Sequence, residues 1–227
     1  MNSPTFPEVE RVAREALIEA ARWMNSSGFN SGTSGNLSLR TARSGAAGLL
    51  ITPSGVPYES LQAGDIVWMD MQGHYEHILS ASSEWAFHLD ILRHKPEVNA
   101  VVHAHPSYCT ALAIHGRAIP AVHYMVAFSG GADIPCARYE TYGTPELSAA
   151  VLEVLAQRNA CLMAHHGMVA TGPTLARALW WAAEVETLAR QYHLALQLGT
   201  PPLLPSAEIE RVREKFKSYG LKERGRR

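Results

Sequence analysis

The chain has 227 residues, of which 47% are hydrophobic and 18% charged, and its 20 Lys and Arg residues against 21 Asp and Glu residues give a formal net charge of −1. This composition is typical of globular proteins and excludes disordered, collagen-like and coiled-coil chains. The balanced charge gives no broad attraction to nucleic acid or to an anionic membrane, so we expect small-molecule partners. The length favours a single domain over residues 1–227.

Cysteine usage and the N-terminal residues bear on the compartment. Cys109, Cys136 and Cys161 form an odd set without CxxC spacing, which favours a reducing compartment. The N-terminal residues lack a charged segment followed by an apolar stretch, and no run of about 18 apolar residues occurs. We therefore expect a cytoplasmic protein with no membrane partner.

The first part of the chain predicts one helix followed by sheet strands. Apolar residues recur at helical spacing from Val9 to Met24, and Gly28 supplies the stop. Short β-prone runs follow at residues 36–40, 49–52 and 66–69. Clusters of Gly, Pro and Ser separate these runs and are typical of turns.

The rest of the chain predicts alternating helices and strands. A helix is expected to run to about His94 from Ser82 or Ser83, either of which could cap it, with Glu84 in the first turn. Later elements are expected in this order: strand 100–105, a helix from Pro106, strand 134–138, a helix opening at Thr144, strand 161–164, a long helix over 173–198 and a last helix over 206–219. The order indicates an α/β domain with a central mixed, mostly antiparallel sheet flanked by helices on both faces.

Two histidines end the predicted strand 100–105. Side chains two residues apart on a strand share a face at a spacing of roughly 6.5–7 Å, so His103 and His105 could bind one metal ion. An isolated pair of this kind is more often one core histidine and one that faces solvent, so a third ligand is needed. His165 or His166 offers one, and the spacing does not choose between them.

Three further segments could bind a phosphate. They are residues 32–36, residues 52–55 and the serine pair at 82 and 83, which Glu84 follows. Backbone N–H groups and hydroxyls in such segments bind anions, although each segment alone is more often a plain turn or helix cap. Tyr124 could donate a proton near a metal-bound substrate or pack in the core. Trp180 and Trp181 on the long helix indicate core or subunit contacts.

Six motifs occur in an order that resembles the class II aldolase/adducin family. They are NSGTSGN at residues 30–36, ITPSGVPY at 51–58, SSEW at 82–85, VVHAH at 101–105, IPCAR at 134–138 and HHG at 165–167. The similarity runs from about residue 10 to residue 220, and so covers nearly the whole chain.

The resemblance implies a set of site residues. A zinc ion would be held by His103, His105 and His166, with Glu84 close enough to bind the ion in the empty enzyme and to act as acid or base with substrate. The resemblance therefore selects His166 over His165. A phosphate pocket is implied for Thr33, Gly35, Asn36, Ser54, Gly55, Ser82 and Ser83.

The resemblance also implies a four-fold symmetric homotetramer with active sites between subunits. Tyr124 would then come from a neighbouring subunit, and Tyr219 from a C-terminal tail that is mobile from about residue 206. The sequence departs from the aldolase pattern in the loop at residues 41–48, which is longer, and at Tyr142, where Phe is expected near the aldehyde.

The implied activity is zinc-dependent, reversible cleavage of a ketose 1-phosphate through a metal-stabilised enediolate. L-Fuculose 1-phosphate is the first candidate substrate, which gives dihydroxyacetone phosphate and L-lactaldehyde. In the cleavage direction Tyr124 would take the proton of the C4 hydroxyl, and Glu84 would return a proton to C3.

Several other functions are alternatives. The same family contains a sugar-phosphate dehydratase, a 4-epimerase, decarboxylases and non-catalytic adducin-like scaffolds. A zinc hydrolase that uses a metal-bound water is a further alternative. Epimerases are expected to carry Asp in place of Glu84, and the intact histidines argue against a scaffold. The phosphate-type turns argue against a hydrolase, so dehydration is the main enzymatic rival.

Overall fold

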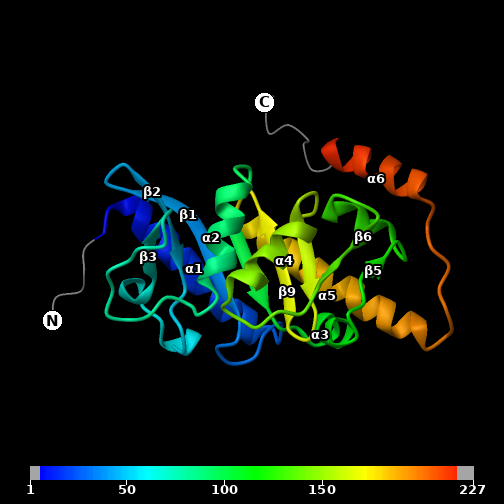
Figure 1. The fold of residues 1–227 in the computed structure, drawn as a ribbon, viewed down its shortest axis with the longest axis horizontal. Helices are drawn as coiled ribbons and strands as arrows, with labels where there is room; N and C mark the ends of the chain where they lie inside the picture. Colours follow the sequence, from blue (N-terminus) through cyan, green and yellow to red (C-terminus); the bar gives the residue numbers. More distant parts are fainter. Residues whose placement is uncertain (1–5, 219–227) are drawn as a thin grey trace, which may run out of the picture.

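A mixed sheet lies at the centre of the computed structural model, which describes residues 6–218 (Figure 1). Within these residues the sheet has seven strands in the order β3-β2-β1-β4-β9-β8-β7. The strands are β1 (Asn36–Arg43), β2 (Ala46–Ile51), β3 (Val67–Asp70), β4 (Ala100–Ala104), β7 (Cys136–Ala137), β8 (Ala160–Met163) and β9 (Gly167–Gly172). Neighbours are antiparallel except β7 and β8, which are parallel. The predicted mixed, mostly antiparallel sheet is confirmed.

Helices cover both faces of this sheet. They are α1 (Glu8–Ser26), α2 (Trp85–His94), α3 (Ser107–Ile114), α4 (Pro145–Leu155), α5 (Leu175–Leu196) and α6 (Ser206–Ser218), with short 3-10 helices η1 (Tyr58–Ser60), η2 (Ala63–Asp65) and η3 (Tyr124–Ser129). Helices α1, α3 and α5 pack on one face, and α2 and α4 on the other (Figure 1). The predicted single α/β domain with helices on both faces is therefore confirmed.

Strand β4 divides the apolar core into two layers because its side chains alternate between the faces. Val102 packs in a buried cluster with Leu17 of α1 and Val185 of α5. Its neighbour Val101 packs in a second cluster with Phe87 of α2 and Leu147 of α4. A strand with both faces buried carries a continuous apolar run, as this one does up to residue 102.

The segment at residues 41–48 is not a loop. Strands β1 and β2 continue through it as a hairpin, paired from Ser38 and Ile51 to Arg43 and Ala46. The two-residue turn at 44 and 45 has positive φ values of 51° and 83°, which suits the right-handed twist of the flanking strands. The strands predicted at 36–40 and 49–52 were therefore too short.

The strand predicted at residues 134–138 is wrong as one element. Pro135 has no N–H to donate, and it separates β6 (Asp133–Ile134) from β7. Strand β6 pairs with β5 (Ile119–Pro120) in a separate two-stranded sheet, whereas β7 joins the main sheet. Strands β5 and β9 were not predicted.

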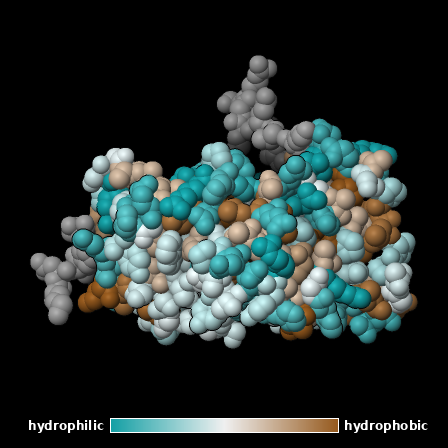
Figure 2. All heavy atoms as spheres, in the orientation of Figure 1, coloured by the Kyte–Doolittle hydropathy of each residue, from teal (hydrophilic) through white to brown (hydrophobic). Residues whose placement is uncertain are grey.

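Helix α6 begins at Ser206 as predicted and docks at one end of the molecule, where the chain is orange to red in Figure 1. Its buried Ile209 and Val212 pack against Ala121 and Ala127. Figure 2 shows apolar side chains gathered at this end, on the right of the view, whereas most of the remaining face is hydrophilic or intermediate. The mobility expected from about residue 206 stays a prediction.

Two observations bear on the compartment expected from the sequence, which stays a prediction. Cys109, Cys136 and Cys161 are free thiols in the structure. Among residues 6–218, no helix combines the length and the apolar character needed to cross a membrane.

A buried arginine ties α1 to the segment before β3. The guanidinium of Arg14 donates to Glu10 Oε1 at 2.7 Å and to the carbonyl oxygens of Ala63 and Ile66 at 2.8 and 2.5 Å. Its side chain is 2% exposed, so these polar groups are out of water. The contact therefore holds α1 against the edge of the sheet that is formed by β3.

We predict that Arg14→Met lowers the free energy of unfolding by about 3 kcal/mol, because it leaves a buried carboxylate and carbonyls short of a partner. Arg11→Met is the matched control on the same helix, since Arg11 contacts Glu8 and Glu15 at the surface. Its expected effect is below about 1 kcal/mol. Urea denaturation of both variants measures the difference, and equal effects would contradict the prediction.

Candidate active site

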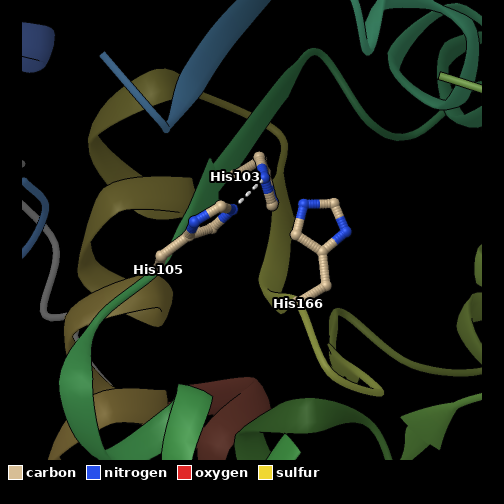
Figure 3. Close-up of side chains that lie close together, drawn as sticks. All are labelled: His103, His105 and His166. Atoms are coloured by element: carbon tan, nitrogen blue, oxygen red, sulfur yellow. Dashed lines mark hydrogen bonds between the residues drawn. The ribbon is translucent and has the colours of Figure 1, made fainter. Parts of the chain in front are cut away.

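Three imidazoles converge where β4 ends beside β9 (Figure 3). His103 lies on β4, His105 follows it, and His166 lies in the turn before β9. The Nε2 atoms of His103 and His105 are 3.0 Å apart, and the three ring centroids are 4.8–4.9 Å apart. The candidate ligand nitrogens all lie within 4.8 Å of one another. The rings therefore face a common point, which a single metal ion could occupy.

The turn between β8 and β9 determines which of its two histidines joins this cluster. His165 has a left-handed φ of 55°, and the N–H of His166 donates to the carbonyl of Met163 at 3.0 Å. The chain is thus a tight turn here and not an extended strand. His166 faces the other imidazoles, whereas the ring of His165 lies 5.8 Å from that of Tyr139.

Glu84 lies beside the imidazoles at the start of α2. Its Oε2 is 3.1 Å from His103 Nε2 and accepts a hydrogen bond from Asn36 Nδ2 at 2.9 Å. Its Oε1 is 3.1 Å from His166 Nε2, is buried, and has no hydrogen-bond partner among the described residues. The carboxylate therefore keeps one unbonded oxygen next to the histidines.

The predicted helix start is corrected by this arrangement. Helix α2 begins at Trp85 with Glu84 as its N-cap residue, and no side chain caps it. Neither Ser82 nor Ser83 caps the helix, although Ser82 Oγ accepts from the N–H of Glu84 at 3.3 Å. A turn occupies these positions instead, closed by the N–H of Trp85, which donates to the carbonyl of Ser82 at 3.0 Å, so the helix starts later.

The protonation states suit metal binding. Burial opposes ionisation of Glu84, but the nearby His103 and His166 lower its pKa overall, so the carboxylate is anionic. Burial, together with His103 and His166, lowers the pKa of His105 to about 3, so this imidazole is neutral at pH 7. Burial also lowers the pKa of His88, which lies in the first turn of α2, to about 3.

The donor set fits a divalent metal ion. His103 Nδ1 donates to the carbonyl of Met168 at 2.9 Å, which turns Nε2 toward the cluster and fixes the tautomer in the way that protein metal sites do. Three imidazole nitrogens and a carboxylate are common ligands of zinc. The unbonded Glu84 Oε1 is a buried acceptor that a cation would satisfy.

A cavity of about 360 Å³ opens beside the cluster and is lined by Glu84, His105 and His166. This volume is in the range of small-molecule sites. All residues predicted to bind phosphate line it: Thr33, Gly35, Asn36, Ser54, Gly55, Ser82 and Ser83. The structure thus brings three segments far apart in sequence to one cavity that is also lined by His105 and His166 of the histidine cluster.

The same cavity has lining residues that the sequence analysis did not identify. Tyr139 and Glu140 follow β7 and line it with Tyr142, for which a place near the aldehyde was expected. The only available signal was their position next to the motif at residues 134–138. Tyr139 and Tyr142 are exposed, so their rings are free to contact a ligand.

One predicted catalytic tyrosine, Tyr124, does not line this cavity. Tyr124 is half exposed and lines a separate groove with Trp180 and Trp181, which are partly exposed. Its expected contribution from a neighbouring subunit stays a prediction. Tyr219 lies outside the described residues.

Comparisons with known proteins agree with the motifs. Residues 15–193 match the family model described as the Class II Aldolase and Adducin N-terminal domain. The 5-methylthioribulose-1-phosphate/5-deoxyribulose-1-phosphate aldolase of Rhodospirillum rubrum is 52% identical over 91% of this chain and 92% of its own length. The L-fuculose phosphate aldolase of Escherichia coli strain K12 is 46% identical over 95% of this chain and 98% of its own length.

A solved structure gives the same result for the fold. A structure titled L-fuculose 1-phosphate aldolase superposes with a TM-score of 0.86 and 37% identity, covering 91% of this chain and 96% of that one. The family match covers most of the chain, and both sequence relatives are aldolases. The chain therefore belongs to the class II aldolase and adducin family, and it is an enzyme of the aldolase type.

Proposed function

We propose that this protein is a zinc enzyme that reversibly cleaves a ketose 1-phosphate to dihydroxyacetone phosphate and an aldehyde. Class II aldolases are metal-dependent, and the three converging histidines could hold the metal. The observation that carries the proposal is the buried carboxylate of Glu84, which keeps one unbonded oxygen beside those histidines in a cavity lined by hydroxyl and backbone donors.

The phosphate of the substrate would bind at the end of the cavity formed by the turns. Ser54, Ser82 and Ser83 offer hydroxyl groups, and Gly55, with a φ of 71° and open space around it, offers an accessible backbone. Such groups bind phosphate through hydrogen bonds without a permanent positive charge. This end would be common to every ketose 1-phosphate.

The chemistry requires that charge and protons be handled at C3 and C4. Zinc held by His103, His105 and His166 would polarise the ketone oxygen and accommodate the negative charge that develops when the C3–C4 bond breaks. A base takes the proton of the C4 hydroxyl, and Tyr124, as its phenolate, is proposed for this step. The electron pair of the broken bond passes to C3, which takes a proton from Glu84. Because Glu84 is anionic in the empty site, it must first take up this proton from solvent.

The proposed use of Tyr124 requires a second subunit. Tyr124 lines a groove that does not include the three clustered histidines of its own chain. We therefore propose a homotetramer with active sites between subunits, in which Tyr124 comes from a neighbour and Tyr219 from the C-terminal tail. The three free cysteines support a reducing compartment, and we propose the cytoplasm.

Two kinds of ketose phosphate are candidates for the substrate. L-Fuculose 1-phosphate would give L-lactaldehyde, and it is supported by the 46% identical relative. The 52% identical relative favours 5-methylthioribulose 1-phosphate and 5-deoxyribulose 1-phosphate, which differ from fuculose 1-phosphate only in the aldehyde half. Tyr139 and Tyr142 are the exposed rings at the cavity that could distinguish these aldehydes.

A substrate panel tests the reaction and its specificity together. We predict that the zinc-loaded protein releases dihydroxyacetone phosphate from at least one of these three ketose phosphates, measured by NADH-coupled reduction. Mass spectrometry should find two fragments whose masses sum to that of the substrate. A single product lighter by one water would instead identify a dehydratase, and an unchanged mass with inverted C4 would identify an epimerase.

The metal ligands can be tested without measuring activity. We predict that His103→Ala weakens zinc binding by more than about 100-fold, because even groups that only support a ligand contribute 10- to 100-fold. His115→Ala is the control, since His115 is an exposed histidine at the end of α3. Zinc content after dialysis, measured by plasma mass spectrometry, separates the two. Full zinc occupancy in His103→Ala would rule out the ligand assignment.

The role of Glu84 can be separated from metal binding. We predict that Glu84→Gln retains zinc but slows exchange of the C3 proton of dihydroxyacetone phosphate with solvent by about 100-fold or more, because the amide cannot carry the proton. Proton NMR in deuterated water follows this exchange. Glu153→Gln changes a surface carboxylate that contacts Arg138 and should leave the rate unaltered. An undiminished rate in Glu84→Gln would refute the role proposed for Glu84.

A further inference from the structure

A chain of hydrogen bonds runs behind Glu84, away from the cavity. Ser38 Oγ lies 2.7 Å from His88 Nδ1, and His88 Nε2 lies 2.5 Å from Asn36 Oδ1. Asn36 Nδ2 then donates to Glu84 Oε2 at 2.9 Å. Ser38 and His88 are fully buried, and Asn36 and Glu84 nearly so. The four side chains thus form one continuous network that ends on the carboxylate.

The network follows from the alternation along β1 and the period of α2. Leu37 points into the core cluster that contains α1 and α5, so its neighbours Asn36 and Ser38 point to the face covered by α2. On that helix His88 lies four residues after Glu84, which is one helical turn. Asn36 and Ser38 of β1 therefore lie against Glu84 and His88 at the start of α2.

The carboxylate determines the direction of every hydrogen bond in the network. Asn36 donates from Nδ2 to Glu84 Oε2, so its Oδ1 faces His88 and can only accept. His88 must then donate from Nε2. With one N–H on the ring, its Nδ1 is left to accept from the hydroxyl of Ser38. If the Asn36 amide were reversed, Asn36 Oδ1 would face Glu84 Oε2, and these two oxygens, neither of which carries a proton, would repel each other.

We propose that His88 and Ser38 are positioning residues that fix the Asn36 amide, so that Asn36 holds Glu84 Oε2 and leaves Oε1 free to act on C3 of the substrate. Both polar ends of the Asn36 side chain are engaged in this way, so Asn36 holds the Glu84 carboxylate in addition to lining the cavity. The inference rests on the proposed proton-transfer role of Glu84.

Three variants test this proposal by the C3 proton exchange of dihydroxyacetone phosphate. His88→Phe keeps a ring beside Phe87 but removes both nitrogens, and should slow exchange by about 10- to 100-fold with an unchanged KM and zinc content. His88→Gln can donate to Asn36 and accept from Ser38, so it should recover most of the lost rate. Ser38→Ala should slow exchange less than His88→Phe.

A matched control removes a different buried hydroxyl that contacts the same helix. Ser148 is 1% exposed and donates to Asp90 of α2 at 2.6 Å, so Ser148→Ala loses an equivalent hydrogen bond without touching the network. It should leave the exchange rate unchanged. A network that served only to hold α2 in place would give equal effects for Ser148→Ala and Ser38→Ala, and that result would overturn the proposal.

The tautomer of His88 gives a second readout that is independent of activity. Nitrogen-15 NMR of the histidine-labelled, zinc-loaded protein should show His88 with its proton on Nε2 and a bare Nδ1. A proton on Nδ1 would overturn the proposal, as would wild-type exchange in His88→Phe or a loss of rate in which only KM changes. If wild-type protein shows no C3 exchange, the proposed function fails, and the tautomer alone then decides the network. If His88→Phe does not fold, Ser38→Ala carries the kinetic test.

Discussion

The register of β4 between β1 and β9 sets the geometry on which the site depends. His103 lies opposite Asn36 of β1 and Val169 of β9, and its side chain therefore emerges on the face covered by α2. Because side chains alternate along a strand, a slip of one residue would turn His103 toward α1 and α5 and bring Val102 to the carboxylate. Backbone pairing on both sides of β4 thus fixes one metal ligand and the support of Glu84 together.

Two glycines allow the neighbouring backbone to approach β4 closely enough for this register. A Cβ at Gly35 would lie 2.7 Å from the carbonyl oxygen of His103, and one at Gly167 would lie 2.5 Å from that of Ala104. A larger residue at either position would push β1 or the β8–β9 hairpin away from β4. Both glycines lie in motifs that carried the family resemblance, at residues 30–36 and 165–167. Each is therefore needed for close backbone packing, in addition to its place next to the site residues.

Sequence patterns predicted the parts of the site that lie in regular strands and failed where the chain turns. The i, i+2 spacing placed His103 and His105 together, because strand alternation holds there. It could not choose between His165 and His166, since the left-handed φ of His165 interrupts the alternation, and the resemblance made that choice. Tyr139 was indicated only by its position next to the motif at residues 134–138, and it reaches the cavity through the tertiary fold. Strand β9 was missed for a similar reason, because its partners β4 and β8 define it better than its own residues.

The electrostatics of Glu84 argue that the cluster is built for chemistry and not for stability. A buried acceptor without a hydrogen bond lowers the stability of the fold by about 1–3 kcal/mol, and a buried polar cluster can often be replaced by apolar residues with no loss. Here the fold satisfies Oε2 through Asn36 and the groups behind it, yet leaves Oε1 unbonded beside His166. An asymmetric carboxylate of this kind has one oxygen held by a protein hydrogen bond and one that is left beside the histidines, where a ligand or substrate can satisfy it.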